Sequence, residues 1–214
     1  MKDLYIVGAG GFGREVAWLV ERINEKEPTW NIKGFIDDDQ SLLGKSEDGY
    51  SVIGDCAYLL ELQKEFWVVC AVGSAKTRKK IIEKIQNNRN IKFATLVDPS
   101  VIMSDKVLIG EGSIICAGTI LTVDITIGKH VIINLDCTVG HDDIINDFVT
   151  MYPSVNVSGN VKVDQCVELG TGSQIIQGKS IASNCMVGAG AVVVTDIKES
   201  GTYVGVPAKR VDNR

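Results

Sequence analysis

The chain changes its pattern of apolar and polar positions near residue 96. Before that point, short apolar runs alternate with segments of helical apolar periodicity, which predicts strands alternating with helices. The strand-like runs lie at residues 3–8, 31–37, 65–73 and 91–97, and the helix-like segments at residues 10–26, 57–63 and 74–88. Such an alternation is typical of a mostly parallel α/β fold. We therefore expect a small Rossmann-like βαβ domain over residues 1–96.

After residue 96 the helical pattern stops and an aliphatic residue or Met recurs at every sixth position. The fifteen positions of this series are Ile109, Ile115, Leu121, Ile127, Ile133, Val139, Ile145, Met151, Val157, Val163, Leu169, Ile175, Ile181, Val187 and Val193. A period of six fits neither a helix nor a simple amphipathic strand. It fits a prism-shaped parallel β-helix with one hexad per face, three faces per coil and the aliphatic side chains stacked inside. We expect this β-helix, with a C-terminal tail, over residues 97–214.

Composition and charge narrow the functional classes. The formal charge of −5 at pH 7 gives no support to nucleic-acid binding. No apolar run approaches the length of a membrane-spanning helix, and the N-terminus lacks the long apolar core of a signal peptide. The six cysteines form no CxxC pair and no metal-ligand cluster with the two histidines. We expect a cytoplasmic protein with no metal site and no membrane insertion.

The first candidate site is the stretch "GAGGFG", Gly8–Gly13, between an expected strand and an expected helix. Glycines there permit a tight turn, and an exposed helix N-terminus attracts phosphate. Asp37 and Asp38 close the next expected strand, where a carboxylate can meet a ribose hydroxyl. Because residues 1–96 supply barely one mononucleotide-binding half, a phosphorylated or nucleotide-linked ligand is favoured over NAD. A close strand–helix turn without a ligand is the alternative.

The second candidate is His141, in the stretch "CTVGHDDIIND". It follows the inward-facing Val139 by two residues, so its side chain should lie outside the β-helix near a corner. Imidazole titrates near neutrality, and a nearby carboxylate raises its basicity, as a proton acceptor requires. Asp142 is the expected partner, but Asp142 or Asp143 can instead be a solvated loop charge. The other histidine, His130, is expected to be structural.

Together these stretches resemble one family, the hexapeptide-repeat acetyltransferases that modify nucleotide-linked amino sugars or sialic acid. The resemblance covers nearly the whole chain and is carried by the hexads and by "YIVGAGGFGREV", "FIDDD", "AVGSAKTRKKI", "GHDDIIND" and "GVPAKRV". It implies a left-handed β-helix, although parallel crossovers are generally right-handed. It also implies an acetyl-CoA-dependent enzyme that N-acetylates a UDP-4-amino-sugar. O-acetylation of sialic acid or another sugar is the alternative within the family.

The resemblance further implies site residues and an assembly. The UDP-sugar would bind the N-terminal domain at Gly10, Gly11, Phe12, Asp37, Asp38 and Gly73. His141 would be the general base, assisted by Asp142, and Asn134, on the coil below, would lie near the acceptor. Acetyl-CoA would lie in a groove between adjacent subunits of a homotrimer, lined here by Gly159, Thr171 and Ala189.

Two positions depart from the family pattern. The family often carries a second histidine nine residues after the base, touching the thioester carbonyl, where this chain has Thr150. A hydroxyl can still donate a hydrogen bond to that carbonyl, so Thr150 stays an expected contact of acetyl-CoA, but it cannot carry a positive charge. Asp142 replaces the more usual glutamate, which shortens the reach to the imidazole by one methylene.

Three readings compete with acetyl transfer. An oxidoreductase or nucleotide sensor would bind NAD at the glycine-rich stretch and use the β-helix as a trimerisation stem. A non-catalytic scaffold would tolerate any substitution of His141. A zinc hydratase needs three histidine ligands, and because the chain has two histidines this reading is excluded.

Overall fold

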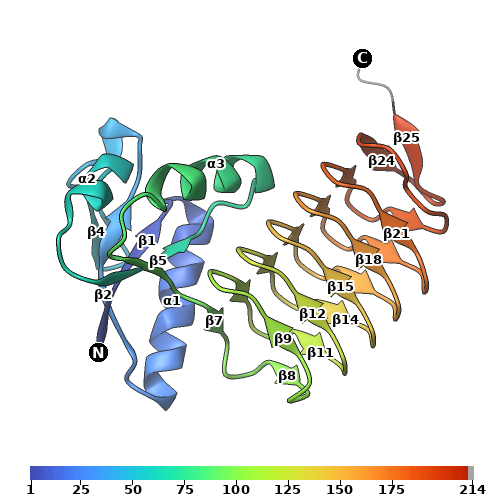
Figure 1. Ribbon diagram of the computed structural model, residues 1–214, viewed down its shortest axis with the longest axis horizontal. Coiled ribbons are helices and arrows are strands. Elements are labelled where there is room, and N and C mark those ends of the chain that lie inside the picture. Colours follow the sequence, from blue (N-terminus) through green and yellow to red (C-terminus); the bar gives the residue numbers. More distant parts are fainter. Residues whose placement is uncertain (212–214) are drawn as a thin grey trace. The chain divides into compact units, whose positions relative to one another are not determined.

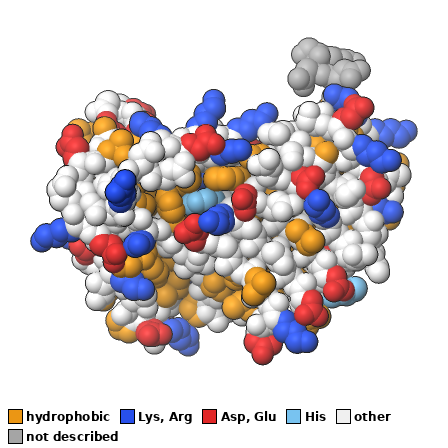
Figure 2. Space-filling model, viewed as in Figure 1, with side chains coloured by type: hydrophobic (Ala, Val, Ile, Leu, Met, Phe, Trp, Pro, Cys, Tyr) orange, Lys and Arg blue, Asp and Glu red, His pale blue; other side chains and the backbone are white. Residues whose placement is uncertain are grey.

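The structure, a computed structural model, describes residues 1–211 and divides into two compact units, residues 1–99 and residues 100 onward (Figure 1). The last three residues of the expected β-helix range lie outside the described residues. Within the described part of the chain, no helix is long and apolar enough to cross a membrane. Figure 2 shows cationic and anionic side chains interspersed over the visible face, with no large region of one sign.

The first unit contains a six-stranded sheet with the order β3-β4-β2-β1-β5-β6, parallel except for the β3–β4 hairpin. Its elements are β1 (Lys2–Val7), α1 (Gly11–Lys26), β2 (Trp30–Ile36), the 3-10 turn η1 (Gln40–Leu42), β3 (Ser46–Glu47), β4 (Tyr50–Gly54), α2 (Cys56–Glu61), β5 (Phe66–Cys70), α3 (Ala75–Ile85), β6 (Ile91–Phe93) and β7 (Leu96–Val97). The chain leaves β1 for β2 on one side and later enters β5 on the other. A topological switch point therefore lies at the carboxyl end of β1, the usual ligand position in such sheets. The Rossmann-like fold predicted for this part of the chain is confirmed.

The hairpin β3–β4 was not predicted. Its turn is Asp48-Gly49, and both residues have positive φ, 48° and 87°. An Asp-Gly pair flanked by residues that pair across two strands is a strong two-residue hairpin signal. The alternation of polar and apolar residues in β4 is short, so the period alone did not reveal it. The single strand expected at residues 91–97 is also divided, into β6 and β7.

The second unit is a parallel β-helix with three faces (Figure 1). Face 1 contains β10 (Ile114–Ile115), β13 (Ile132–Ile133), β16 (Thr150–Met151), β19 (Glu168–Leu169), β22 (Met186–Val187), β24 (Thr202–Val204) and β25 (Lys209–Val211). Face 2 contains β8 (Ile102–Met103), β11 (Ile120–Leu121), β14 (Thr138–Val139), β17 (Asn156–Val157), β20 (Gln174–Ile175) and β23 (Val192–Val193). Face 3 contains β9 (Leu108–Ile109), β12 (Thr126–Ile127), β15 (Ile144–Ile145), β18 (Lys162–Val163) and β21 (Ser180–Ile181). Ile114 pairs with Ile132, 18 residues later, so one coil is three hexads.

The hexad series forms the core of the β-helix, as predicted. Fourteen of its fifteen residues, Ile115 through Val193, are each at most 3% exposed, and Ile109 in the first coil is partly exposed. The aliphatic column excludes water from Ile115 to Val193. Burial of each such side chain contributes about 1.5–3 kcal/mol to folding. The coil that carries His141 is therefore held by packed neighbours on both sides.

The corners are turned by residues with positive φ. Besides glycines, these are Asp124, His130, Asp136, Asp142, Phe148, Ser154, Asn160, Cys166 and Asn184, all between 54° and 62°. Asp and Asn are the side chains best tolerated there, which accounts for their frequency at these turns. His130 is buried and stacks on Phe148 of the next coil with ring centroids 5.2 Å apart. Its contacts are those of a packing residue.

Candidate active site

His141 lies in the turn of residues 140–143, which joins β14 on face 2 to β15 on face 3. Its side chain is on the outside of the β-helix and 53% exposed. Asp142 N–H donates to the carbonyl of Val123 in the preceding coil at 3.2 Å, and the carbonyl of His141 accepts from Asn160 N–H in the following coil at 2.7 Å. The main chain of the turn is thus fixed on both sides while the ring remains accessible.

Asp142 and Gly159 set the surroundings of the two ring nitrogens. Oδ2 of Asp142 lies 2.8 Å from Nδ1 of His141. Because an ionised carboxylate only accepts hydrogen bonds, Nδ1 of the neutral ring carries the hydrogen and Nε2 carries the lone pair. A Cβ atom on Gly159 would lie 2.5 Å from Nε2, so glycine at this position is what makes room for the ring. The structure therefore brings these three predicted residues together.

Asp143, left open by the sequence as a solvated loop charge, is instead 1% exposed. Burial raises its pKa to about 7, although hydrogen bonds from the N–H groups of Val161 and Gly140 and the charge of His141 act in the opposite direction. The burial of Asp143 could have been predicted from its position in the 18-residue repeat. The residues 18 before and 18 after it are Ile125 and Val161, both buried, so Asp143 occupies an inward-facing place of the turn.

Asn134, Thr171 and Ala189 lie at a different corner, the one between face 1 and face 2. Asn134 follows β13 and precedes β14, in the same coil as His141 and not on the coil below it as expected. The Thr171 turn is stacked against the Ala189 turn, since Gly190 N–H donates to the Thr171 carbonyl at 2.9 Å. Strand β14 separates this corner from His141. Within one chain these residues therefore do not meet the imidazole.

Thr150 is the first residue of β16 on face 1. It is 1% exposed, so its hydroxyl is not presented at the surface in the way that the His141 ring is. The residue that stands in place of the family's second histidine is thus on another face of the prism from His141.

The glycine-rich stretch has two kinds of glycine. Gly8 has φ of 102° and Gly13 packs so tightly that a Cβ atom on it would overlap the carbonyl oxygen of Gly8. Gly10, the N-cap of α1, has nothing within 4 Å of where a Cβ would be, and Gly11 has only the end of a flexible Arg side chain. Gly8 and Gly13 therefore close the turn, while Gly10 and Gly11 leave open space at the helix N-terminus, next to the partly exposed Phe12.

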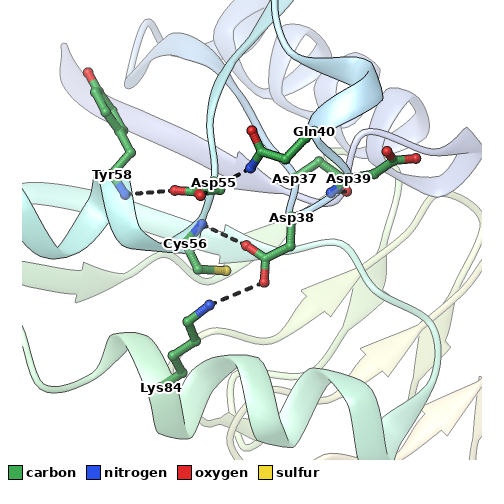
Figure 3. A network of polar contacts seen from close by, with 8 residues as sticks. All are labelled: Asp37, Asp38, Asp39, Gln40, Asp55, Cys56, Tyr58 and Lys84. Carbon is green, nitrogen blue, oxygen red and sulfur yellow. Dashed lines mark hydrogen bonds and ion pairs between the residues drawn. The ribbon is translucent and has the colours of Figure 1, made fainter.

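Asp37 and Asp38 follow β2 at the same edge of the sheet. Oδ2 of Asp37 accepts from Ala9 N–H at 2.9 Å and its Oδ1 accepts from Asp39 N–H at 3.0 Å, so Asp37 fixes the glycine-rich loop. Asp38 accepts from Cys56 N–H at 2.9 Å and pairs with Lys84 Nζ at 3.2 Å (Figure 3). The Cys56 N–H hydrogen bond and then the Lys84 contacts lower the pKa of Asp38 against the effect of burial. The Asp38 carboxylate is half-exposed and negative.

Gly73 lies in the loop after β5, the third strand end at this edge. Arg78 of α3 is 1% exposed, and its Nη1 donates to the carbonyls of Val72 at 2.7 Å and Gly73 at 3.0 Å. Sequence reading missed Arg78, because one basic residue among five in a helix carries no signal of burial. The predicted glycines, aspartates and Gly73 thus converge at the carboxyl ends of β1, β2 and β5. This edge is the switch point of the sheet.

Metal ligation finds no support in the side-chain arrangement. Across residues 1–211, no three His, Cys, Asp or Glu side chains are grouped so that they could hold a metal ion. What the His141 turn offers is an exposed imidazole with a carboxylate beside Nδ1 and with Nε2 open over Gly159. That arrangement suits proton removal from a bound acceptor.

Comparison with known proteins identifies the family to which the chain is related. Residues 3–85 match the family model described as the PglD N-terminal domain. GDP-perosamine N-acetyltransferase of Escherichia coli O157:H7 is 29% identical over 178 residues, which is 82% of this chain and 79% of that protein.

Two solved structures match over nearly the full length. One is the acetyltransferase domain of PglB from Neisseria gonorrhoeae in complex with acetyl coenzyme A, with 31% identity, a TM-score of 0.88 and coverage of 98% of this chain and 99% of that chain. The other is PerB from Caulobacter crescentus in complex with CoA and GDP-perosamine, with 28% identity, a TM-score of 0.89 and coverage of 99% and 98%. The predicted fold, a Rossmann-like unit followed by a left-handed parallel β-helix, is confirmed by this likeness. The chain belongs to the hexapeptide-repeat acetyltransferases and is an acyltransferase.

Proposed function

We propose that this protein transfers the acetyl group of acetyl-CoA to the amino group of a nucleotide-linked amino sugar. The observation that carries the proposal is the His141 turn, in which Nδ1 faces Asp142 at 2.8 Å and Nε2 lies open over Gly159. The likeness to a GDP-perosamine N-acetyltransferase, and to a structure that holds CoA and GDP-perosamine, supports both the donor and the acceptor class. The six buried cysteines, none of which forms a disulfide within the described residues, and the use of acetyl-CoA favour a cytoplasmic enzyme.

The chemistry requires a base because the acceptor amine is protonated at neutral pH and an ammonium has no lone pair. The ammonium first releases one proton to solvent. As the neutral amine attacks the thioester carbonyl, Nε2 of His141 takes a second proton from the nitrogen, and Asp142 stabilises the imidazolium that forms. The C–N bond forms and the C–S bond breaks. The CoA sulfur leaves as a thiolate and receives the proton from His141, which restores the neutral ring. No acyl-enzyme is needed, because a thioester is already activated.

The nucleotide-linked part of the acceptor would bind at the switch point of the first unit. Open space at Gly10 and Gly11 exposes the N-terminus of α1, which favours a diphosphate. We propose that Phe12, Asp38 and Gly73 border that space, while Asp37 fixes the glycine-rich loop. We propose a UDP-linked 4-amino sugar as the first substrate to test and a GDP-linked one as the second, since the Escherichia coli relative is a GDP-perosamine N-acetyltransferase.

The donor would bind in a groove between two copies of the chain in a homotrimer. The reason is geometric: Asn134, Thr171 and Ala189 lie at the corner before β14, and His141 lies at the corner after it. One chain cannot bring both corners to one thioester, but neighbouring copies can place one corner of each against the other. Gly159 beside the ring would line the His141 side of this groove.

A thiol-release assay tests the activity. Acetyl-CoA is offered with UDP-4-amino sugars, with GDP-perosamine and with free sialic acid, and only the first two classes should release CoA. His141→Ala should fold normally and lose at least about 10²-fold in kcat, the usual contribution of a general base. Asp105→Ala, at the equivalent turn position two coils earlier, is the matched control and should keep wild-type kcat. Wild-type turnover in His141→Ala would refute the base, and acetyl transfer to sialic acid alone would refute N-acetylation.

Mixing two inactive variants tests the shared groove. His141→Ala and Asn134→Ala are each expected to be weak, and co-refolding them yields assemblies in which some grooves combine an intact His141 with an intact Asn134 of the neighbour. Activity should rise above that of either parent. If both residues act from one chain, the mixture stays at the average of its parents.

A further inference from the structure

One carboxylate lies inside the wall of the β-helix at the turn that carries His141. Asp143 is buried, whereas the equivalent residues one coil before and one coil after it are Ile125 and Val161. An aliphatic side chain fills such a place without any loss of hydration, and a buried carboxylate is strongly disfavoured unless it is hydrogen-bonded. Its presence here calls for a reason that packing does not supply.

The hydrogen bonds of Asp143 connect the two turns that surround the imidazole. Oδ2 accepts from Gly140 N–H at 3.1 Å, directly before His141. Oδ1 accepts from Val161 N–H of the following coil at 2.7 Å. Because Gly159 lies in that following turn and its missing Cβ is what admits the ring, the spacing between the two turns sets where Nε2 lies. Asp143 bridges that spacing directly.

A neutral side chain makes the same kind of bridge elsewhere in this β-helix. Ser113 Oγ accepts from Val131 N–H of the following coil at 3.0 Å and donates to the Gly128 carbonyl at 2.9 Å. That turn carries no exposed histidine. Bridging two coils therefore requires an acceptor but no charge, and the charge at Asp143 needs an explanation of its own.

The groups that face Asp143 supply this explanation. His141 and Asp142 are the titratable neighbours whose charges act on it, and the residues stacked on either side, Ile125 and Val161, carry no charge. Burial raises the pKa of Asp143 to about 7, so the carboxyl exchanges its proton near neutral pH. When it is ionised, its negative charge in a poorly hydrated place stabilises a positive imidazole nearby.

We propose that Asp143 is a positioning residue for His141, whose buried carboxylate fixes the two turns around the ring and stabilises the imidazolium formed during proton removal. This inference rests on the proposed function, because Asp143 acts only through His141. It assigns the two adjacent aspartates different tasks. Asp142 orients the ring from outside, and Asp143 holds the turn from within.

The test uses the full-length protein and three variants. Asp143→Ser keeps an acceptor for Val161 N–H and removes the charge, Asp143→Val removes both, and Ser113→Ala is the matched control that removes the neutral bridge. With acetyl-CoA and GDP-perosamine, or the best acceptor of the panel, Asp143→Ser should lose about tenfold in kcat at pH 8 and Asp143→Val about 10²-fold, with both KM values within about twofold of wild type. Ser113→Ala should lower the unfolding temperature and leave kcat unchanged.

The pH profile separates positioning from a general loss of stability. As the pH falls from 8 to 6, wild-type Asp143 gains a proton and loses the charge that Asp143→Ser lacks, so the deficit of the variant should shrink. In a His141→Ala background, Asp143→Ser should reduce kcat no further. If Asp143→Ser does not fold at the assay temperature, Asp143→Asn provides the same comparison.

Wild-type kcat at pH 8 in a folded Asp143→Ser would overturn the inference. So would a deficit that is constant with pH and persists without His141. These outcomes leave the proposed function intact, provided that His141→Ala is inactive. If His141→Ala is fully active, the base assignment fails first and the Asp143 inference fails with it.

Discussion

Nδ1 of His141 lies 2.8 Å from Oδ2 of Asp142, the next residue in the chain. Two adjacent side chains can meet in this way because Asp142 has φ of 62°, a conformation forced by the corner of the β-helix. The same corner residue in the preceding coil is Asp124, with φ of 55° and no histidine before it. The preceding coil thus provides an internal control for the proposed catalytic pair.

Asp142→Asn should keep the turn, since Asn tolerates this φ, and should lower kcat roughly tenfold to hundredfold because an amide cannot stabilise the imidazolium as a carboxylate does. Steady-state kinetics at pH 8 measures the loss. Asp124→Asn makes the same chemical change one coil earlier and should leave kcat at the wild-type value. Equal effects of the two substitutions would indicate that the carboxylate at the corner is only structural.

Gly159→Ala should displace the imidazole, because the new Cβ would lie 2.5 Å from Nε2. Gly159 is not one of the glycines with positive φ, so the backbone at this position is compatible with an alanine. A ring shifted by about 1 Å typically reduces turnover by about 10²-fold, with a smaller effect on binding of the acceptor.

The control for Gly159→Ala is Gly190→Asn, at a glycine with φ of 66° and no neighbour within 4 Å of a Cβ. Asn occupies the same conformation at Asn184. Gly190→Asn should fold as well as wild type in a thermal scan. An active Gly159→Ala, with unchanged kcat, would mean that the ring does not work from the position seen over Gly159.

The sequence predicted the β-helix because an aliphatic residue or Met recurs at every sixth position fifteen times in succession. This period fits a prism in which each face contributes one inward aliphatic side chain per coil. It also placed His141 outside, since the register counted from Val139 determines which side chains point away from the core. The same register applied to every turn position would have shown Asp143 as buried. The prediction rested on the hexad column alone, and Asp143, which breaks the aliphatic pattern of Ile125 and Val161, lies outside that column.

Other relationships could not be read from one chain's pattern. The ring of His141 and the backbone of Gly159 are 18 residues apart, and their contact depends on how successive coils stack. The placement of Asn134 on the coil below His141 was instead an error that the hexad count could have prevented, because seven residues span one face and not one coil, and Asn134 lies at the opposite end of β14. Arg78 was missed for a different reason: its burial follows from the carbonyls of Val72 and Gly73 that turn toward it.

The glycine-rich loop permits a clean separation of folding from ligand binding. Gly13→Ala would place a Cβ against the carbonyl oxygen of Gly8, and the required shift of backbone should reduce the free energy of unfolding by about 1–3 kcal/mol. Gly10→Ala meets no atom within 4 Å and should unfold at the wild-type temperature. Calorimetry measures both.

Gly10→Ala, which is expected to leave stability unchanged, should instead affect substrate binding. Gly10→Ala should raise KM for the nucleotide sugar several-fold, since its methyl group enters the space proposed for the diphosphate, and should leave KM for acetyl-CoA unchanged. An unchanged KM for both substrates would show that the loop is a strand–helix turn without a ligand, the alternative that the sequence allowed.

Asp143 also makes stability depend on pH in a defined direction. Its pKa of about 7 in the folded protein lies above the value of about 3.9 expected in the unfolded chain. Between these values the folded state binds more protons, so the contribution of Asp143 to stability is complete below about pH 4 and is lost as the pH rises through 7. Relative to Asp143→Ser, the wild-type free energy of unfolding should therefore fall on the order of 2 kcal/mol from pH 5 to pH 8. Urea unfolding at fixed protein concentration measures this difference, and a difference that stays constant or grows with pH would show that Asp143 is ionised throughout and that burial does not raise its pKa.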